Sequence, residues 1–297
     1  MEGAWVLALP HGLAHTAVMD PDASDEMTDH LVDFFDQVAP SYDTWAGGQH
    51  ARVAARLVEL AAPKRGEHAL DVGTGTGLVA HLLAAKVSPG SVIGIDLSDR
   101  MLSIARAKKG KNLQFLGMAA ERLVFKPQTF DLVTMGEALA YLADPTDALA
   151  EAHRVLRSGG RLAVSCQRRS LSTRAQDLFF QGLAPLARRH YLRLPRYSSE
   201  RARFGEPDVL PQLLGAAGFE VSKLTEMVTG GRTQNAQEWT DLMAGAGPLP
   251  YTLISGLGPR YRIELEAEVE SAMASLGDPD DAFRYHHSYI VAVARKV

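Results

Sequence analysis

Apolar and polar positions follow two different periods through the middle of the chain. Between residues 67 and 166, short apolar runs are separated by segments in which apolar residues recur every three or four positions. The short runs predict buried strands and the longer segments predict helices. The predicted strands are 67–72, 91–96, 112–117, 130–135 and 161–166. Strands that alternate with helices are typical of a parallel sheet with helices on both faces.

The pattern changes on either side of this region. Before it, residues 29–39 and 49–62 have helical spacing and end at prolines, which predicts an N-terminal helical cap. After it, two further strands are expected at 219–228 and 286–296, with helices around 207–217 and within 236–274. The pattern therefore predicts an α/β fold with a seven-stranded, mostly parallel sheet.

Two segments break the alternation of strands and helices, at about 167–206 and 232–284. We expect them to form helical lid insertions near the ligand-binding end of the sheet rather than an independent domain. Residues 1–28 are expected to form a flexible tail. The apolar patch within residues 1–18 has no basic segment ahead of it, which argues against a signal peptide. Residues 29–297 then form a single domain with its core at 64–166.

Composition narrows the class of protein. The 297 residues are 46% hydrophobic and 22% charged, as in an ordinary globular protein. The net charge of −4 argues against a nucleic-acid partner. A single cysteine, Cys166, allows no intramolecular disulfide and no zinc cluster, which favours a reducing, cytoplasmic setting. No apolar run reaches the roughly 18 residues that would span a membrane.

Residues 69–80 read ALDVGTGTGLVA, an apolar run followed by glycines at alternate positions. The stretch predicts a strand that turns sharply into a helix and brings the backbone close to a nucleotide-like ligand. The spacing G-x-G-x-G is one residue shorter than that of the dinucleotide fingerprint, and Asp71 precedes the first glycine by two. A carboxylate there suits a ligand with an ammonium group and a sulfonium, such as S-adenosylmethionine. Asp96, which ends the second strand, could accept hydrogen bonds from both ribose hydroxyls.

On these motifs the chain resembles the class I S-adenosylmethionine-dependent methyltransferases, in particular the ubiquinone/menaquinone C-methyltransferase-like group (methyltransferase type 11). The resemblance covers about residues 30–166 and implies a Rossmann-like fold. The segments that carry it are FFDQVAPSYDTW (34–45), ALDVGTGTGLVA (69–80), VIGIDLSDRML (92–102), AAERLVF (119–125) and FDLVTMGEALAYLADPTDALAEAHRVLRSGGRLAVS (130–165).

The resemblance implies a set of cofactor-binding residues. They are Tyr42, closing over the cofactor; Asp71, Gly73 and Gly75 at the methionine end; Gly77, allowing the helix to approach; Asp96 on the ribose; Leu97 and Met101 around the adenine; Ala120 and Glu121 at the adenine edge; and Glu137 near the cofactor or the acceptor.

One position departs from the family pattern. The residue before Ala120 is usually an Asp that accepts the adenine amino group, whereas this chain has Ala119. Cofactor binding should survive with one hydrogen bond fewer, a loss of roughly 0.5–1.5 kcal/mol.

The sequence narrows the methyl acceptor mainly by exclusion. It carries no motif typical of adenine, glutamine or arginine methylation, and no Asp and Asn cluster of the catechol-type magnesium site, so no metal is expected. A small molecule remains, aromatic, quinone-like or polyketide-like as in secondary metabolism, methylated at carbon, oxygen or nitrogen. Candidate catalytic residues are His190, His286, His287 and Glu137.

Several alternatives stay open. The arginines between residues 168 and 203 could attract an acidic acceptor or form a solvated face, of which we favour the second. The protein could keep the cofactor but catalyse a cyclisation or rearrangement, or it could be a non-catalytic partner subunit. An NAD-dependent enzyme fits the glycine spacing and Asp71 less well. A homodimer is possible.

Overall fold

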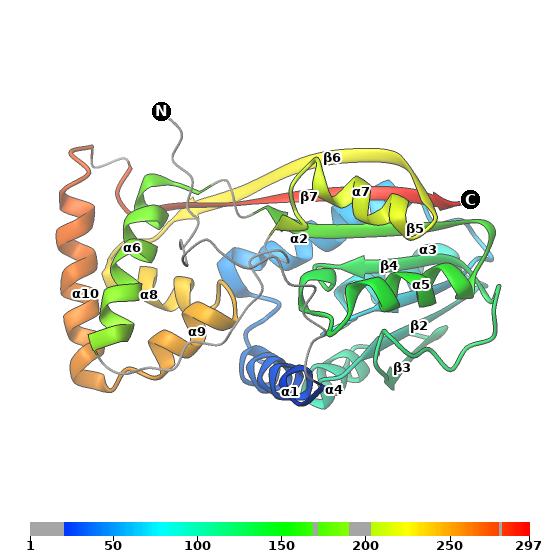
Figure 1. Cartoon of the computed structure of the whole chain (residues 1–297), viewed down its shortest axis with the longest axis horizontal. Coiled ribbons are helices and arrows are strands. Elements are labelled where there is room, and N and C mark those ends of the chain that lie inside the picture. The colour runs from blue at the N-terminus through cyan, green and yellow to red at the C-terminus, as the bar shows by residue number, and fades with distance from the viewer. Residues whose placement is uncertain (1–20, 169–171, 190–202, 279–280) are drawn as a thin grey trace.

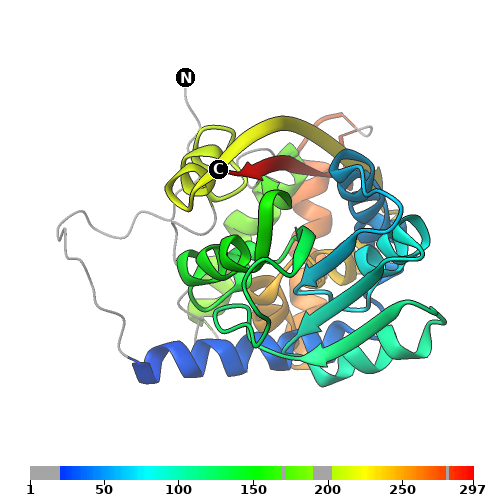
Figure 2. The same ribbon diagram turned by 90° about the vertical axis from the view of Figure 1, so that its right-hand side faces the viewer.

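The computed structural model describes residues 21–168, 172–189, 203–278 and 281–297. Its seven strands form one sheet in the order β3-β2-β1-β4-β5-β7-β6 (Figures 1 and 2). The strands β1 to β5 pair in parallel, and β7 is antiparallel to both β5 and β6. The predicted mostly parallel, Rossmann-like sheet is therefore confirmed. The strands are β1 (His68–Val72), β2 (Ser91–Asp96), β3 (Leu113–Gly117), β4 (Phe130–Gly136), β5 (Leu156–Arg168), β6 (Phe219–Arg232) and β7 (Arg284–Lys296).

Helices cover both faces of the sheet, because alternate residues of each buried strand point to opposite sides. On one face, strand residues pack with α2 and α3 around Leu57 and Leu83. On the other face they pack with α5 and α7 around Leu149 and Leu210. The described helices are α1 (Pro21–Val38), α2 (Trp45–Ala61), α3 (Leu78–Val87), α4 (Asp99–Ala107), η1 (Leu139–Tyr141), α5 (Pro145–Val155), α6 (Arg174–Arg189), α7 (Val209–Ala216), α8 (Ala236–Ala244), α9 (Pro248–Ser255) and α10 (Pro259–Ala274).

The helices α6, α8, α9 and α10, together called the helical insertion below, pack around an apolar cluster of their own that includes Trp239. They lie at one end of the sheet, where β6 and β7 continue side by side into them (Figure 1). Residues 169–171, 190–202 and 279–280 of the expected lid segments lie outside the described residues. Whether the insertion acts as a lid stays a prediction.

Several boundaries differ from those expected, among them those of β6, β5 and α1. The strand β6 extends to Arg232, beyond the expected residue 228, because Gly230 and Gly231 let it approach β7 closely: a Cβ on Gly230 would lie 2.4 Å from the carbonyl oxygen of Tyr285. The strand β5 begins at Leu156, five residues earlier than expected. The helix α1 begins at Pro21, within the segment assigned to the tail. Proline suits the first turn of a helix, and the acidic residues that follow suit its N-terminus.

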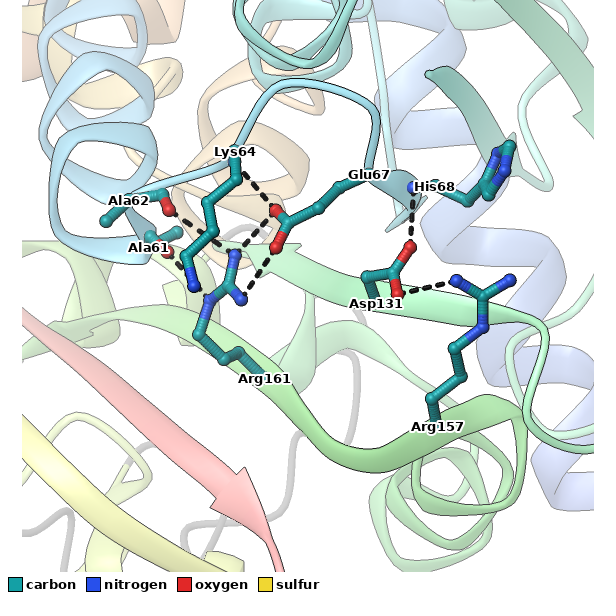
Figure 3. Close-up of polar contacts among 8 residues, drawn as sticks. All are labelled: Ala61, Ala62, Lys64, Glu67, His68, Asp131, Arg157 and Arg161. Atoms are coloured by element: carbon teal, nitrogen blue, oxygen red, sulfur yellow. Dashed lines mark hydrogen bonds and ion pairs between the residues drawn. The ribbon is translucent and has the colours of Figure 1, made fainter.

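Ion pairs connect neighbouring elements at the end of the sheet where β1 and β4 begin (Figure 3). Arg161 on β5 reaches Glu67 with two nitrogens, at 2.9 and 2.7 Å, and its Nε donates to the carbonyl oxygen of Ala61 at the end of α2. Arg157 similarly pairs with Asp131 at 2.6 Å. These contacts lie away from the carboxyl ends of β1 and β2, so we assign them to stability.

Candidate functional site

The glycine-rich turn joins β1 to α3. Gly73, Gly75 and Gly77 have φ values of +65°, +53° and +82°, in the left-handed region that favours glycine. A Cβ on Gly73 would lie 2.5 Å from the Cβ of Ala138, so only glycine fits there. A Cβ on Gly77 would lie 3.0 Å from the ring of Phe115, which accounts for the close packing of α3.

Asp71 lies behind this turn and is almost completely buried. Its Oδ1 accepts a hydrogen bond from the hydroxyl of Thr134 (2.6 Å) and its Oδ2 accepts one from Thr74 (2.7 Å). Burial raises the pKa of Asp71 to about 6, although the two hydroxyl donors act in the opposite direction. The carboxylate thus ties the turn to β4, and direct contact with a ligand stays a prediction.

Asp96 stands at the mouth of the turn, at the end of β2. Its Oδ2 accepts the backbone N–H of Gly75 (2.8 Å) and its Oδ1 accepts that of Ser98 (2.9 Å). Burial raises its pKa, and these backbone donors partly offset that effect. Each carboxylate oxygen keeps a lone pair available, because a carboxylate offers about four acceptor sites. Asp96 is therefore oriented by the protein and still able to accept hydrogen bonds from a diol.

The turn and Asp96 border an open cavity of about 810 Å³, called the cofactor cavity below. Two of the predicted cofactor residues, Asp71 and Gly77, do not line it. The predicted residues that do are Tyr42, Gly73, Gly75, Asp96, Leu97, Met101, Ala120, Glu121 and Glu137.

The helix α1 closes the cofactor cavity from one side, which sequence reasoning did not anticipate. Thr28, Leu31 and Phe35 line the cavity at helical spacing. The hydroxyl of Ser98, the residue after Asp96 and Leu97, donates to the carboxylate of Asp36 and fastens α1 beside the turn. The spacing of these side chains along 28–35 was the signal that could have revealed this wall.

The cavity fits S-adenosylmethionine in its chemistry. The spare acceptor positions of Asp96 match the ribose hydroxyls, and the apolar side chains of Leu97, Met101 and Ala120 match the faces of adenine. At the turn, the absence of a Cβ on Gly73 leaves room that any other residue would fill. Among the described residues, no group of three His, Cys, Asp or Glu side chains is placed to hold a metal ion.

A second cavity of about 560 Å³, called the aromatic cavity below, adjoins the first. Four side chains line both cavities and form their common wall: Phe35, Tyr42, Glu137 and Tyr141. The aromatic cavity is further lined by Phe34, Trp45, His50, Gln167 and Tyr289. Aromatic side chains thus form a large part of its wall, and small, aliphatic and polar residues form the rest.

Glu137 is the acidic residue of the common wall. Its carboxylate Oε2 lies 3.0 Å from Nδ1 of His50, a residue of α2 that sequence reasoning missed. Its backbone has φ of +56°, and its N–H donates to the carbonyl oxygen of Ser165 at 2.9 Å. The signal for His50 was its position near the start of α2, in the helix that begins at Trp45 and follows the loop that holds Tyr42.

The candidate histidines that the structure describes, His286 and His287, lie elsewhere. His287 is 2% exposed, lines neither cavity, and its Nδ1 lies 3.2 Å from Nε2 of Gln167. Burial, with smaller effects from His50 and His286, lowers its pKa to about 4. His286 lies on the opposite face of β7 from His287 and Tyr289. His190 lies outside the described residues. Of the three catalytic candidates that the structure describes, Glu137 alone lines the cavities.

The arginines of the 168–203 stretch contact protein groups or solvent where they are described. Arg168 pairs with Glu206 and Glu226, each at 3.1 Å. Arg174 and Arg203 are exposed. The side chains of the other arginines of this stretch lie outside what the structure describes, so the choice between an acceptor-binding patch and a solvated face stays a prediction.

Comparisons with known proteins agree with this geometry. A family model described as a methyltransferase domain matches residues 70–164. A demethylmenaquinone methyltransferase of Roseiflexus sp. (strain RS-1) is 32% identical over 216 residues, which cover 69% of this chain and 90% of that protein. A demethylmenaquinone methyltransferase of Thermus thermophilus is 33% identical over 201 residues, covering 63% of this chain and 91% of that protein.

Solved structures share the fold. The YcgJ protein from Bacillus subtilis has a TM-score of 0.53 and 18% identity, covering 82% of this chain and 98% of that one. The cyclase SpnF has a TM-score of 0.53 and 21% identity, covering 89% of this chain and 94% of that one. At these identities the likeness concerns the fold alone. Sequence motifs, cavity chemistry and relatives together place the chain in the class I S-adenosylmethionine-dependent methyltransferases.

Proposed function

We propose that the protein transfers a methyl group from S-adenosylmethionine to a small aromatic molecule, such as a quinone precursor, held in the aromatic cavity. The observation that carries this proposal is the common wall: a cavity suited to the cofactor and a cavity lined by aromatic side chains share Phe35, Tyr42, Glu137 and Tyr141. The relatives named demethylmenaquinone methyltransferase support a quinone-like acceptor.

Each of the predicted cofactor residues would contact a different part of the cofactor. Asp96 would hold the ribose, Leu97 and Met101 would contact the adenine, and the backbone of Gly73 and Gly75 would approach the methionine end. When bound, S-adenosylmethionine supplies an electrophilic methyl group and leaves as S-adenosylhomocysteine. The chain itself aligns the acceptor for an in-line displacement and excludes water from the junction of the two cavities.

The acceptor side is built for a flat, largely apolar molecule. Phe34, Phe35 and Trp45 offer ring faces and edges, and aromatic rings pack favourably in such surroundings. Tyr289 adds a polar group whose oxygen accepts a hydrogen bond from Nε2 of Gln49, so its own proton is available to an acceptor oxygen. We place the reaction in the cytoplasm and in secondary metabolism, with no nucleic-acid partner, and the homodimer stays a prediction.

The first experiment is calorimetric titration with S-adenosylhomocysteine. We expect the wild type to bind it and Gly73→Ala to lose at least tenfold in affinity, because the added Cβ would lie 2.5 Å from Ala138 and close the turn. The control is Gly159→Ala, which carries similar backbone strain (φ +71°) with open space around the added Cβ. Gly159→Ala should bind as the wild type does, and absence of wild-type binding contradicts the proposal.

The second experiment follows label from methyl-labelled S-adenosylmethionine into short-chain demethylmenaquinol and related hydroxylated aromatic compounds. Transfer of label to one of them supports the proposal. Conversion of an acceptor without label transfer would indicate a cyclisation or rearrangement instead, and the fold likeness to SpnF does not decide between these outcomes.

A further inference from the structure

His50 and Glu137 form a polar pair at the junction of the two cavities. The Nδ1 of His50 lies 3.0 Å from Oε2 of Glu137, and the two side chains are only 14% and 15% exposed. Glu137 lines both cavities, whereas His50 lines the aromatic cavity alone. The imidazole is therefore on the acceptor side and the carboxylate is between the two ligands.

Two aromatic rings hold the imidazole in place. The ring of Tyr42 stacks on His50 in parallel, with centroids 4.1 Å apart, and the ring of Trp45 lies at 5.1 Å and 22°. Trp45 is itself fixed, because its Nε1 donates to the carbonyl oxygen of Leu242 at 3.0 Å. Because the imidazole is held between two rings, its orientation is fixed. Its Nδ1 stays directed at the carboxylate of Glu137, and its Nε2 stays directed away from it.

The backbone of Glu137 is held in an unfavourable conformation. A φ of +56° is uncommon for a residue other than glycine, and such positions gather at functional sites. The N–H of Glu137 donates to both the carbonyl oxygen and the hydroxyl of Ser165, which keeps this conformation in place. A pair that only joined α2 to β4 would need neither the strained backbone nor a position at the junction.

We propose that His50 is the general base that takes a proton from the methyl acceptor, and that Glu137 is the positioning residue that sets its tautomer. This inference rests on the proposed function. With Nδ1–H directed at the carboxylate, Nε2 carries the free lone pair. The proton moves from an acceptor oxygen or carbon to Nε2, and the electron pair left behind forms the bond to the methyl carbon. The electrons of the broken carbon–sulfur bond stay on the leaving sulfur, and the proton later passes to water.

The titratable groups around the pair include Tyr42, Tyr289 and His287, together with Tyr141 and Asp96. Burial raises the pKa of Tyr42 and of Tyr289 well above the usual tyrosine value, with a further contribution from the charge of Glu137. Burial lowers the pKa of His287, on β7 behind Trp45. Tyr141 and Glu137 both line the common wall, and Asp96 contributes charge near Tyr42. The two tyrosines with raised pKa and His287 therefore stay neutral near pH 7.

The kinetic test uses His50→Gln, Glu137→Gln and Glu137→Asp with short-chain demethylmenaquinol as the acceptor probe. We expect His50→Gln to lower kcat by about 100-fold or more, as expected for loss of a general base. Glu137→Gln should lower kcat about tenfold and displace the pH profile, and Glu137→Asp should recover part of both. The control His68→Gln changes an exposed histidine at the far edge of the sheet and should behave as the wild type. The variants His50→Gln and His68→Gln should bind S-adenosylhomocysteine within about threefold of the wild type.

A second readout does not depend on turnover. Nitrogen-15 NMR of labelled histidine should show neutral His50 as the Nδ1–H tautomer in the wild type, and a changed tautomer balance in Glu137→Gln. The Nε2–H tautomer in the wild type would overturn the proposal, as would a His50→Gln variant with wild-type kcat and pH profile. If the wild type binds no S-adenosylhomocysteine or methylates no probe, the proposed function fails, and the tautomer still tests the pair.

Discussion

At the scale of single residues, His287 shows how burial changes the chemistry of a side chain that looked catalytic in the sequence. It is 2% exposed, its Nδ1 faces Gln167, and Nε2 has no hydrogen-bond partner among the described residues. A charged imidazole there would lose its hydration without gaining a carboxylate. The native state therefore favours the neutral form, and a pKa of about 4 in the folded protein follows.

This difference predicts a pH-dependent stability. The folded pKa of about 4 lies below the unfolded value of about 6.5, so the unfolded chain binds the proton first as the pH falls. The contribution of neutral His287 to the free energy of unfolding is fully present above about pH 6.5. It is lost between there and about pH 4, which lowers the free energy of unfolding by about 3 kcal/mol. Urea unfolding at several pH values should show this slope in the wild type. In His287→Gln the slope should be smaller, whatever its stability at pH 8, and in His68→Gln it should be unchanged.

At the scale of elements, the ends of strands matter as much as their interiors. Arg161 and Glu67 are 13% and 12% exposed, and the Arg161 guanidinium also donates hydrogen bonds to the carbonyl oxygens of Ala61 and Ala62 at the end of α2 (Figure 3). Burial alone would raise the pKa of Glu67, but hydrogen bonds from Arg161 and from the backbone of Lys64 lower it overall. One side chain thus joins β5, the start of β1 and α2.

Arg161→Ala should destabilise the protein by about 3 kcal/mol, the lower range for breaking a buried ion pair. The matched variant is Arg157→Ala, whose side chain is 44% exposed and whose loss should cost about 0.5–1 kcal/mol. The pKa of Glu67 is lowered in the folded protein. Its ionised carboxylate therefore adds to the free energy of unfolding above its unfolded pKa, and this contribution is lost as the pH falls through its folded pKa. Urea unfolding should therefore show a smaller difference between the wild type and Arg161→Ala in acid than at pH 7. Equal effects of the two variants would contradict this assignment.

At the scale of the whole molecule, the helical insertion meets the sheet domain at Trp45. The Nε1 of Trp45 donates to Leu242 of α8, and Gly245, just after that helix, packs directly on its ring. In the same region, Phe34 of α1 contacts Tyr251 of α9 with ring centroids 5.2 Å apart. The aromatic cavity is therefore assembled from segments far apart in the sequence, whereas most of the cofactor cavity comes from residues 28–143.

This division predicts that the two cavities can be perturbed separately. A Cβ at position 245 would lie 2.1 Å from Nε1 of Trp45, so Gly245→Ala must displace the indole. We expect KM for the acceptor probe to rise about tenfold while the affinity for S-adenosylhomocysteine stays within about twofold. Gly258→Ala, in the same insertion but with open space around the added Cβ, is the control. If the acceptor probe and S-adenosylhomocysteine both bound equally less well, the two cavities would be coupled.

The local pattern of the sequence was enough for the sheet and the glycine turn. Each depends on neighbours within a few positions. The predictions failed where a distant contact decides the outcome. The strand β6 continues through two glycines because β7 lies beside it, and nothing within residues 219–232 indicates that partner.

The sequence by itself determined the parallel core, the glycines of the turn and the position of Asp96, because strand period, positive φ and a carboxylate at a strand end are local properties. Only the tertiary structure decided that Asp71 ties the turn to Thr134, that His287 is buried and that His50 meets Glu137. The pair is 87 residues apart in the chain. The side chains of His50 and Glu137 meet because of the way α2 packs against the sheet, and that packing depends on the whole fold.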